Sequence, residues 1–241
     1  MRGTIAALHG IGADGRTFHA LASAMGRPDL RAMNLPGYAG EPGLPDGFDT
    51  LKQWLGRALP ESPSVLIGHS IGSMLALDFA LDHPDRVSGL VLVCTTPAFG
   101  GPDPSFKEAF VKARMAGLDA GKTMADLAPE MAKGYLGDGV SDAALALGTA
   151  MSAEIPEATF RAVMNTLVTF NRRDALGEVA CPCLIVAGSN DQNAPSKTMV
   201  KMAERLPQSR YVEFDAGHGL PMECPDALAE AVNAFLHDFN L

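Results

Sequence analysis

A serine between glycines is the residue best placed for nucleophilic chemistry in this 241-residue sequence. It is Ser70, in the pentapeptide 68–72 (GHSIG), which follows an apolar run at 64–67 and precedes a helical pattern at 71–81. A strand that turns so tightly into a helix leaves no room for side chains at its two glycines, and it exposes the serine at the carboxyl edge of a sheet. The sequence predicts Ser70 as a catalytic nucleophile; an ordinary glycine-rich turn is the alternative.

A serine hydroxyl needs a base to accept its proton, and His218 is the best candidate among the six histidines. It lies in the loop 215–221 (DAGHGLP), just after an apolar run, where a side chain can reach across the carboxyl edge of a sheet. His69 neighbours the serine and is expected to point elsewhere on the turn, and His9 is expected to shape its own loop. We therefore expect His218 to act as the general base, with a merely structural loop histidine as the alternative.

An aspartate could hold this histidine in one tautomer and stabilise its charged form. Asp191 follows the apolar run 183–187 directly, in the tetrapeptide 188–191 (GSND). Asp215 is a weaker candidate because it lies close to His218 in the chain. We expect Asp191 to orient the base, and the alternative is a turn aspartate that caps the next helix.

A tetrahedral intermediate on the serine would need hydrogen-bond donors for its oxyanion. The amide of Ile71 is one candidate, because it follows the nucleophile at the start of a helix. The amide of Ile11 is the other, since the glycines of the loop 9–12 (HGIG) let the backbone approach a substrate closely. Both donors are backbone groups, so we expect their side chains to tolerate replacement better than the triad does.

Short apolar runs that alternate with helical patterns must position these residues. The runs lie at 4–8, 30–35, 64–68, 87–94, 183–187 and 210–214, and helical patterns lie at 48–58, 71–81, 196–205 and 225–239. Such runs show little polar alternation, as expected of parallel strands covered on both faces. The pattern predicts an α/β fold with a mostly parallel sheet of about six strands and helices on both faces.

The stretch 97–177 breaks this rhythm, because it holds no convincing strand. We interpret it as a helical cap inserted into a core formed by residues 1–96 and 178–241. Its large apolar residues are expected to form mostly the interior of the cap, with a few lining a substrate pocket: Phe99, Phe106, Phe110, Met115, Met124, Met131, Met151, Phe160, Met164 and Phe170. Three of its arginines could bind a substrate carboxylate, although exposed surface positions are the simpler interpretation: Arg161, Arg172 and Arg173.

Composition excludes some classes of function. The formal net charge of −9 argues against a nucleic-acid partner, because nucleic-acid-binding proteins usually carry a basic patch. No apolar run reaches the length of about 18 residues that a membrane span needs, and no signal peptide is visible. The four cysteines show no metal-ligand spacing. We expect a cytoplasmic protein with reduced thiols and no membrane partner.

These motifs together resemble the α/β-hydrolase superfamily, in its branch of capped bacterial esterases, lactonases and carbon–carbon bond hydrolases. The resemblance is carried by His9-Gly10, 34–38 (NLPGY), the GHSIG pentapeptide, 83–87 (HPDRV), 187–191 (AGSND), 217–218 (GH) and 223–225 (ECP). The chain order serine, aspartate, histidine is also that of the superfamily. The resemblance implies a Ser70–His218–Asp191 triad, an acyl-enzyme, a small-molecule substrate, and no need for a cofactor or metal.

One departure from the superfamily concerns its antiparallel N-terminal hairpin, which has no counterpart in this sequence. We therefore expect an α/β-hydrolase fold lacking that hairpin, with a sheet edge that a second copy covers in a homodimer.

Two further functions remain open at this stage. The chain could be a ligand receptor or signalling protein of the same fold with slow turnover. It could also be a cofactor-free perhydrolase or haloperoxidase that uses the same triad with peroxide. Fold-level resemblance does not distinguish these from an esterase, lactonase or carbon–carbon bond hydrolase.

Overall fold

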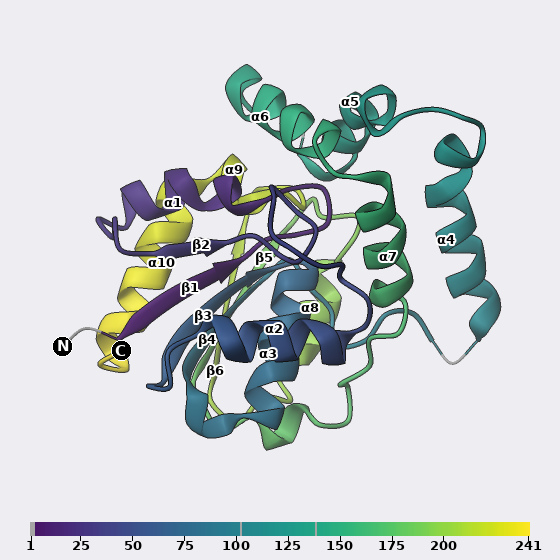
Figure 1. Ribbon diagram of the computed structural model, residues 1–241. Helices are drawn as coiled ribbons and strands as arrows, with labels where there is room; N and C mark the ends of the chain where they lie inside the picture. Colours follow the sequence, from purple (N-terminus) through teal and green to yellow (C-terminus); the bar gives the residue numbers. More distant parts are fainter. Residues whose placement is uncertain (1–2, 102, 138) are drawn as a thin grey trace.

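Six parallel strands form the sheet in a computed structural model, which describes residues 3–101, 103–137 and 139–241 (Figure 1). The strands are β1 (Thr4–Leu8), β2 (Arg31–Met33), β3 (Ser64–His69), β4 (Val87–Val93), β5 (Cys183–Gly188) and β6 (Ser209–Phe214). Their order across the sheet is β2-β1-β3-β4-β5-β6, and every neighbouring pair is parallel. The predicted fold class is confirmed, and β2 forms one edge of this sheet.

Helices cover both faces of the sheet, because each central strand is apolar on both sides. On β3, Val65 and Ile67 pack toward one core cluster, while Leu66 packs toward the other. The first cluster includes α1 (His19–Ala24) and α10 (Pro225–Asp238), and the second includes α2 (Phe48–Ala58), α3 (Ile71–Asp82) and α8 (Ser196–Ala203). The remaining short helices are η1 (Gly15–Phe18), η2 (Pro84–Arg86), η3 (Leu176–Glu178) and α9 (Leu220–Glu223).

A helical insertion separates β4 from β5, as the sequence predicted. It holds α4 (Pro104–Asp119), α5 (Met124–Tyr135), α6 (Asp142–Ala153) and α7 (Glu157–Leu167), which gather on one side of the sheet in Figure 1. The two ends of the insertion lie side by side. Ala98 and Asn171 form an antiparallel β-bridge, and Phe99 N–H donates to the carbonyl of Phe170 at 2.9 Å. The insertion is therefore anchored at both ends beside the carboxyl edge of the sheet.

Candidate active site

Ser70 lies in a strained turn between β3 and α3. Its φ of 55° and ψ of −120° lie outside the regions that L-residues favour. A Cβ at Gly68 would lie 2.3 Å from Ser73 Cα, and a Cβ at Gly72 would lie 2.1 Å from the carbonyl oxygen of Leu8. Both positions exclude a side chain, so only glycine lets the helix start this close to the strands. The turn presents Ser70 to a cavity above the sheet.

Replacing Gly72 with alanine should destabilise the fold by at least about 3 kcal/mol, because the added methyl group overlaps buried backbone that cannot rotate away. The midpoint of urea unfolding measures this loss. Gly134→Ala in α5 is the matched control: nothing lies within 4 Å of its added Cβ, and alanine favours helix by roughly 1 kcal/mol. Equal midpoints for Gly72→Ala and the wild type would contradict the account of the turn.

A chain of hydrogen bonds joins Ser70, His218 and Asp191. Ser70 Oγ lies 3.0 Å from His218 Nε2, and His218 Nδ1 lies 2.7 Å from Asp191 Oδ2. The three residues follow β3, β6 and β5, so the shared carboxyl edge of parallel strands brings them together. This arrangement can pass a proton from the serine hydroxyl to the imidazole and can stabilise the imidazolium that forms.

Asp191 is held in place as a buried, ionised carboxylate. Its second oxygen accepts the N–H groups of Asn193 at 2.7 Å and Ala194 at 2.9 Å. Burial alone would raise the pKa of the Asp191 carboxyl, but the hydrogen bond and charge of His218 and these two N–H groups outweigh burial and hold that pKa below its ordinary value. Asp215 takes no part: it accepts a hydrogen bond from the Asn190 side chain at 2.7 Å.

The loop that carries Ile11 is fixed by His9. The buried His9 ring accepts the N–H of Leu35 on Nε2 at 3.0 Å, so its Nδ1–H donates to the carbonyl of Gly10 at 2.8 Å. That carbonyl shares a trans peptide with the Ile11 N–H, and the two groups point in opposite directions. His9 therefore sets the direction of the Ile11 amide. Ile11 lines the same cavity as Ser70, while Ile71 begins α3 directly after the serine.

His69 supports the loop of His218. Its Nε2–H donates to the backbone carbonyl of His218 at 2.6 Å. Burial is the main cause that lowers the pKa of His69 to about 3, and burial likewise lowers the pKa of His9 to about 4. Both rings therefore stay neutral at the pH where most enzymes work.

These two histidines should make the fold sensitive to acid. Between pH 6.5, the ordinary histidine pKa, and about pH 4 the unfolded chain binds protons that the folded His9 and His69 do not. The free energy of unfolding therefore falls as the pH drops through this window, by an amount on the order of 3 kcal/mol for His9 alone. Urea unfolding at pH 7.5, 6 and 5 measures the slope. His9→Gln should show a shallower slope than the wild type, and an identical slope would contradict this account.

The cavity beside Ser70 has a volume of about 550 Å³ and is lined largely by the insertion. Five of the predicted apolar residues line it: Phe99, Phe110, Met131, Phe160 and Met164. Four others are buried in the interior, namely Met115, Met124, Met151 and Phe170, whereas Phe106 is 54% exposed. A larger open hollow of about 980 Å³ between α1, β2 and α2 includes none of Ser70, Asp191 and His218.

The charged groups at the cavity differ from the predicted arginines. Arg161 pairs with Asp119 and Glu157 at 2.8 Å each, and Arg172 pairs with the buried Asp78 at 2.5 Å. None of the three predicted arginines lines the cavity; Arg114, Lys122 and Glu130 do. Their place in the cavity depends on how α4 and α5 pack, and no local sequence signal indicates it.

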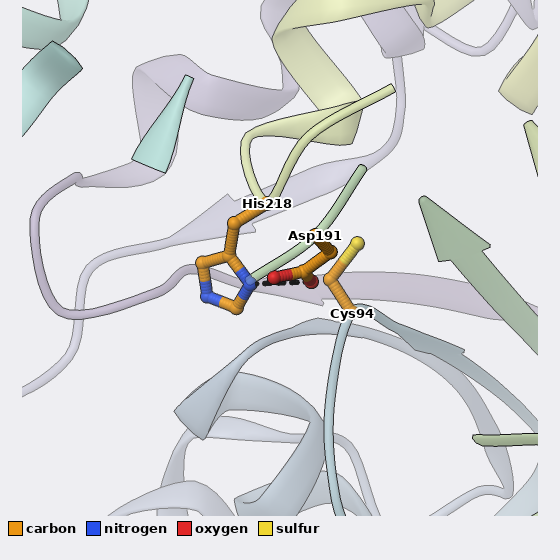
Figure 2. Close-up of side chains that lie close together, drawn as sticks. All are labelled: Cys94, Asp191 and His218. Atoms are coloured by element: carbon orange, nitrogen blue, oxygen red, sulfur yellow. Dashed lines mark hydrogen bonds and ion pairs between the residues drawn. The ribbon is translucent and has the colours of Figure 1, made fainter. Parts of the chain in front are cut away.

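Cys94 adds a thiol beside the aspartate (Figure 2). Its sulfur and the facing atoms of Asp191 and His218 all lie within 4.8 Å of one another. Thiolate, carboxylate and imidazole are zinc ligands, but the imidazole and carboxylate already share a 2.7 Å hydrogen bond. Burial, then the charge of Asp191, raises the pKa of the Cys94 thiol well above its ordinary value, which favours the protonated form. The arrangement therefore suits proton transfer better than metal binding.

A sequence profile of the alpha/beta hydrolase family matches residues 5–231. The chain belongs to this family. It is a hydrolase, as the sequence predicted. Within the part of the chain that the structure describes, no helix is both long and apolar enough to cross a membrane.

Known alpha/beta hydrolases resemble the chain over nearly its whole length. It is 30% identical over 236 residues to the pimeloyl-(acyl-carrier protein) methyl ester esterase of Aromatoleum aromaticum, which covers 92% of this chain and 93% of that protein. A thermophilic esterase from Thermogutta terrifontis superimposes with a TM-score of 0.83 at 23% identity, covering 99% of this chain and 92% of that one. The enol-lactonase of Burkholderia xenovorans superimposes with a TM-score of 0.83 at 21% identity, covering 98% of this chain and 92% of that one. The two structural likenesses support the fold.

Proposed function

We propose that this hydrolase cleaves small-molecule carboxylic esters through an acyl-enzyme on Ser70. The observation that carries the proposal is the hydrogen-bonded series of Ser70, His218 and Asp191 that opens into an apolar cavity. A nucleophile, a base within 3.0 Å of it and an orienting carboxylate are the groups that acyl transfer needs.

In the first step Ser70 Oγ attacks the ester carbonyl carbon while its proton moves to His218 Nε2. The carbonyl oxygen becomes an oxyanion, and the amides of Ile11 and Ile71 donate to it. A single donor of this kind typically contributes a factor of about 10² to 10³ in rate. Asp191 stabilises the imidazolium and remains ionised throughout.

In the second half of the reaction His218 returns the proton to the leaving alcohol oxygen as the carbon–oxygen bond breaks. Water then takes the place of the alcohol, gives a proton to His218 and attacks the acyl-enzyme. The intermediate collapses to a free acid, and Ser70 regains its proton. Each step uses groups of this chain and water alone.

The lining of the cavity favours an ester with an apolar acyl chain. Phenylalanine and methionine side chains of the insertion line part of the cavity, while its charged residues Arg114, Lys122 and Glu130 are exposed and lie on α4, in the following loop and on α5. The relative from Aromatoleum aromaticum is named for a methyl ester of an acyl chain, and we propose substrates of the same general chemistry. Lactones are cyclic esters, so the same steps would open them.

Steady-state hydrolysis of a substrate panel tests the proposal. The panel holds p-nitrophenyl esters of increasing acyl length, methyl esters of dicarboxylic acids, lactones and acidic enol substrates, each tested with wild type and Ser70→Ala. We expect turnover of esters that depends on Ser70 and increases with acyl length. Turnover confined to the carbon–carbon substrates, or peroxide-dependent halogenation without ester hydrolysis, would overturn it.

A further inference from the structure

The loop of His218 is held by groups from three separate elements. The N–H of Gly217 donates to Glu223 Oε2 at 2.7 Å, and the carbonyl of His218 accepts from His69 at 2.6 Å. The N–H of Gly219 donates at 2.7 Å to the carbonyl of Tyr135, the last residue of α5. Glycines flank His218 on both sides, so this loop has little conformational restraint of its own. Its geometry therefore depends on these external partners.

Glu223 occupies the centre of this arrangement. A Cβ at Gly137 would lie 2.4 Å from its Oε2, and Cβ atoms at Gly217 and Gly219 would lie 3.1 and 3.2 Å from its Oε1. Three glycines, one from the insertion and two from the loop, thus leave space that the carboxylate fills. Within the described residues Oε1 is buried and has no hydrogen-bond partner. Burying such an oxygen costs stability, whereas the other oxygen, Oε2, fixes the position of the Gly217 N–H.

The insertion is joined to the same loop. Tyr135 lines the cavity, accepts the Gly219 N–H on its carbonyl, and donates its hydroxyl to the carbonyl of Gly12 at 3.4 Å. The end of α5 therefore contacts the loop of the expected base and the loop of the expected oxyanion donor. A substrate that packs against α5 would stabilise both loops at once.

We propose that Glu223 is a positioning residue that clamps the His218 loop against the end of α5. The clamp fixes the position of the general base relative to the cap. This inference rests on the proposed function of the site. His218 Nε2 must stay within hydrogen-bond reach of Ser70, and a misplacement of about 1 Å can cost a factor of about 10² in rate. The clamp acts on Gly217 N–H through an acceptor oxygen, and no proton of Glu223 takes part.

The experiment compares wild type with Glu223→Ala, Glu223→Gln and the control Glu230→Ala, an exposed glutamate on α10. Each is assayed on the best ester of the panel, and folding is checked by thermal unfolding. Glu223→Ala should lose about a hundredfold in kcat with KM changed less than threefold. Glu223→Gln should recover to within about tenfold of wild type, because its amide oxygen still accepts the Gly217 N–H. Glu230→Ala should match the wild type.

Gly137→Ala tests the clamp from the side of the insertion, and it decides the matter if Glu223→Ala does not fold. Its methyl group would displace the Glu223 carboxylate, so kcat should fall. The control Gly177→Ala should leave kcat unchanged, because its added Cβ meets nothing within 4 Å and Gly177 does not line the cavity. Folded Glu223→Ala and Gly137→Ala with kcat within threefold of wild type would overturn the inference, as would equal losses in Glu223→Ala and Glu223→Gln. A wild type that lacks turnover dependent on Ser70 would instead refute the proposed function.

Discussion

Ser70→Ala should remove at least 99.9% of ester hydrolysis, a loss of about 10³ or more in kcat/KM, and leave the protein folded. The alanine variant has no oxygen to form the acyl-enzyme, so only substrate binding and the oxyanion donors remain to accelerate attack by water. Ser70 is a turn residue that faces the cavity, and its hydroxyl is not part of the core. The measurement is steady-state hydrolysis, with thermal unfolding as the check on folding.

Residual activity decides how this result is interpreted. A folded Ser70→Ala protein that retains more than about one thousandth of wild-type kcat/KM would exclude Ser70 as the nucleophile. Thr95→Val is a useful control, because Thr95 also lines the cavity and its hydroxyl donates to the Ser70 carbonyl at 3.1 Å. We expect that variant to keep activity within about tenfold, since it removes one neutral hydrogen bond.

Asp191→Asn should lower kcat by a factor of roughly 10³ to 10⁴. The amide that replaces Oδ2 can donate to His218 Nδ1, and this favours the tautomer that carries its proton on Nε2. That nitrogen then cannot accept the proton of Ser70, from which it lies 3.0 Å. The loss should appear in kcat, with KM changed much less.

Asp215→Asn is the matched control for this substitution. Asp215 lies in the same region but bonds to Asn190, away from the histidine, so its replacement should leave kcat within about threefold of wild type. Near-normal activity in Asp191→Asn together with a large loss in Asp215→Asn would contradict this account, because it would show that Asp215 orients the histidine.

The fold could be predicted from the sequence where apolar patterning is strong. Helix α2 spans the predicted residues 48–58, and all six strands begin within one residue of the apolar runs. Helix α1 escaped prediction because its six residues bury only Leu21, too little for a periodic pattern. The insertion was recognised by the absence of strands, but its packing depends on contacts that local sequence does not encode.

The three residues of the hydrogen-bonded series were predictable for a geometric reason. Ser70, Asp191 and His218 each follow a strand, and parallel strands place their carboxyl ends at one edge. The supporting contacts were not predictable in this way. Glu223 belongs to the ECP tripeptide that carries the family resemblance, but neither that tripeptide nor the surroundings of Tyr135 indicate a contact with the His218 loop, which arises from tertiary packing. The positioning role of Glu223 and the catalytic roles of Ser70, His218 and Asp191 are predictions for experiment.

Covalent labelling tests the central claim most directly. The protein is treated with a fluorophosphonate, its intact mass is measured, and the modified residue is located by peptide mapping. We predict a single adduct on Ser70 of the wild type, no adduct on Ser70→Ala, and slower labelling of Asp191→Asn. An adduct on another residue, or ester turnover by a wild type that the reagent never labels at Ser70, would contradict the assignment of Ser70 as the nucleophile.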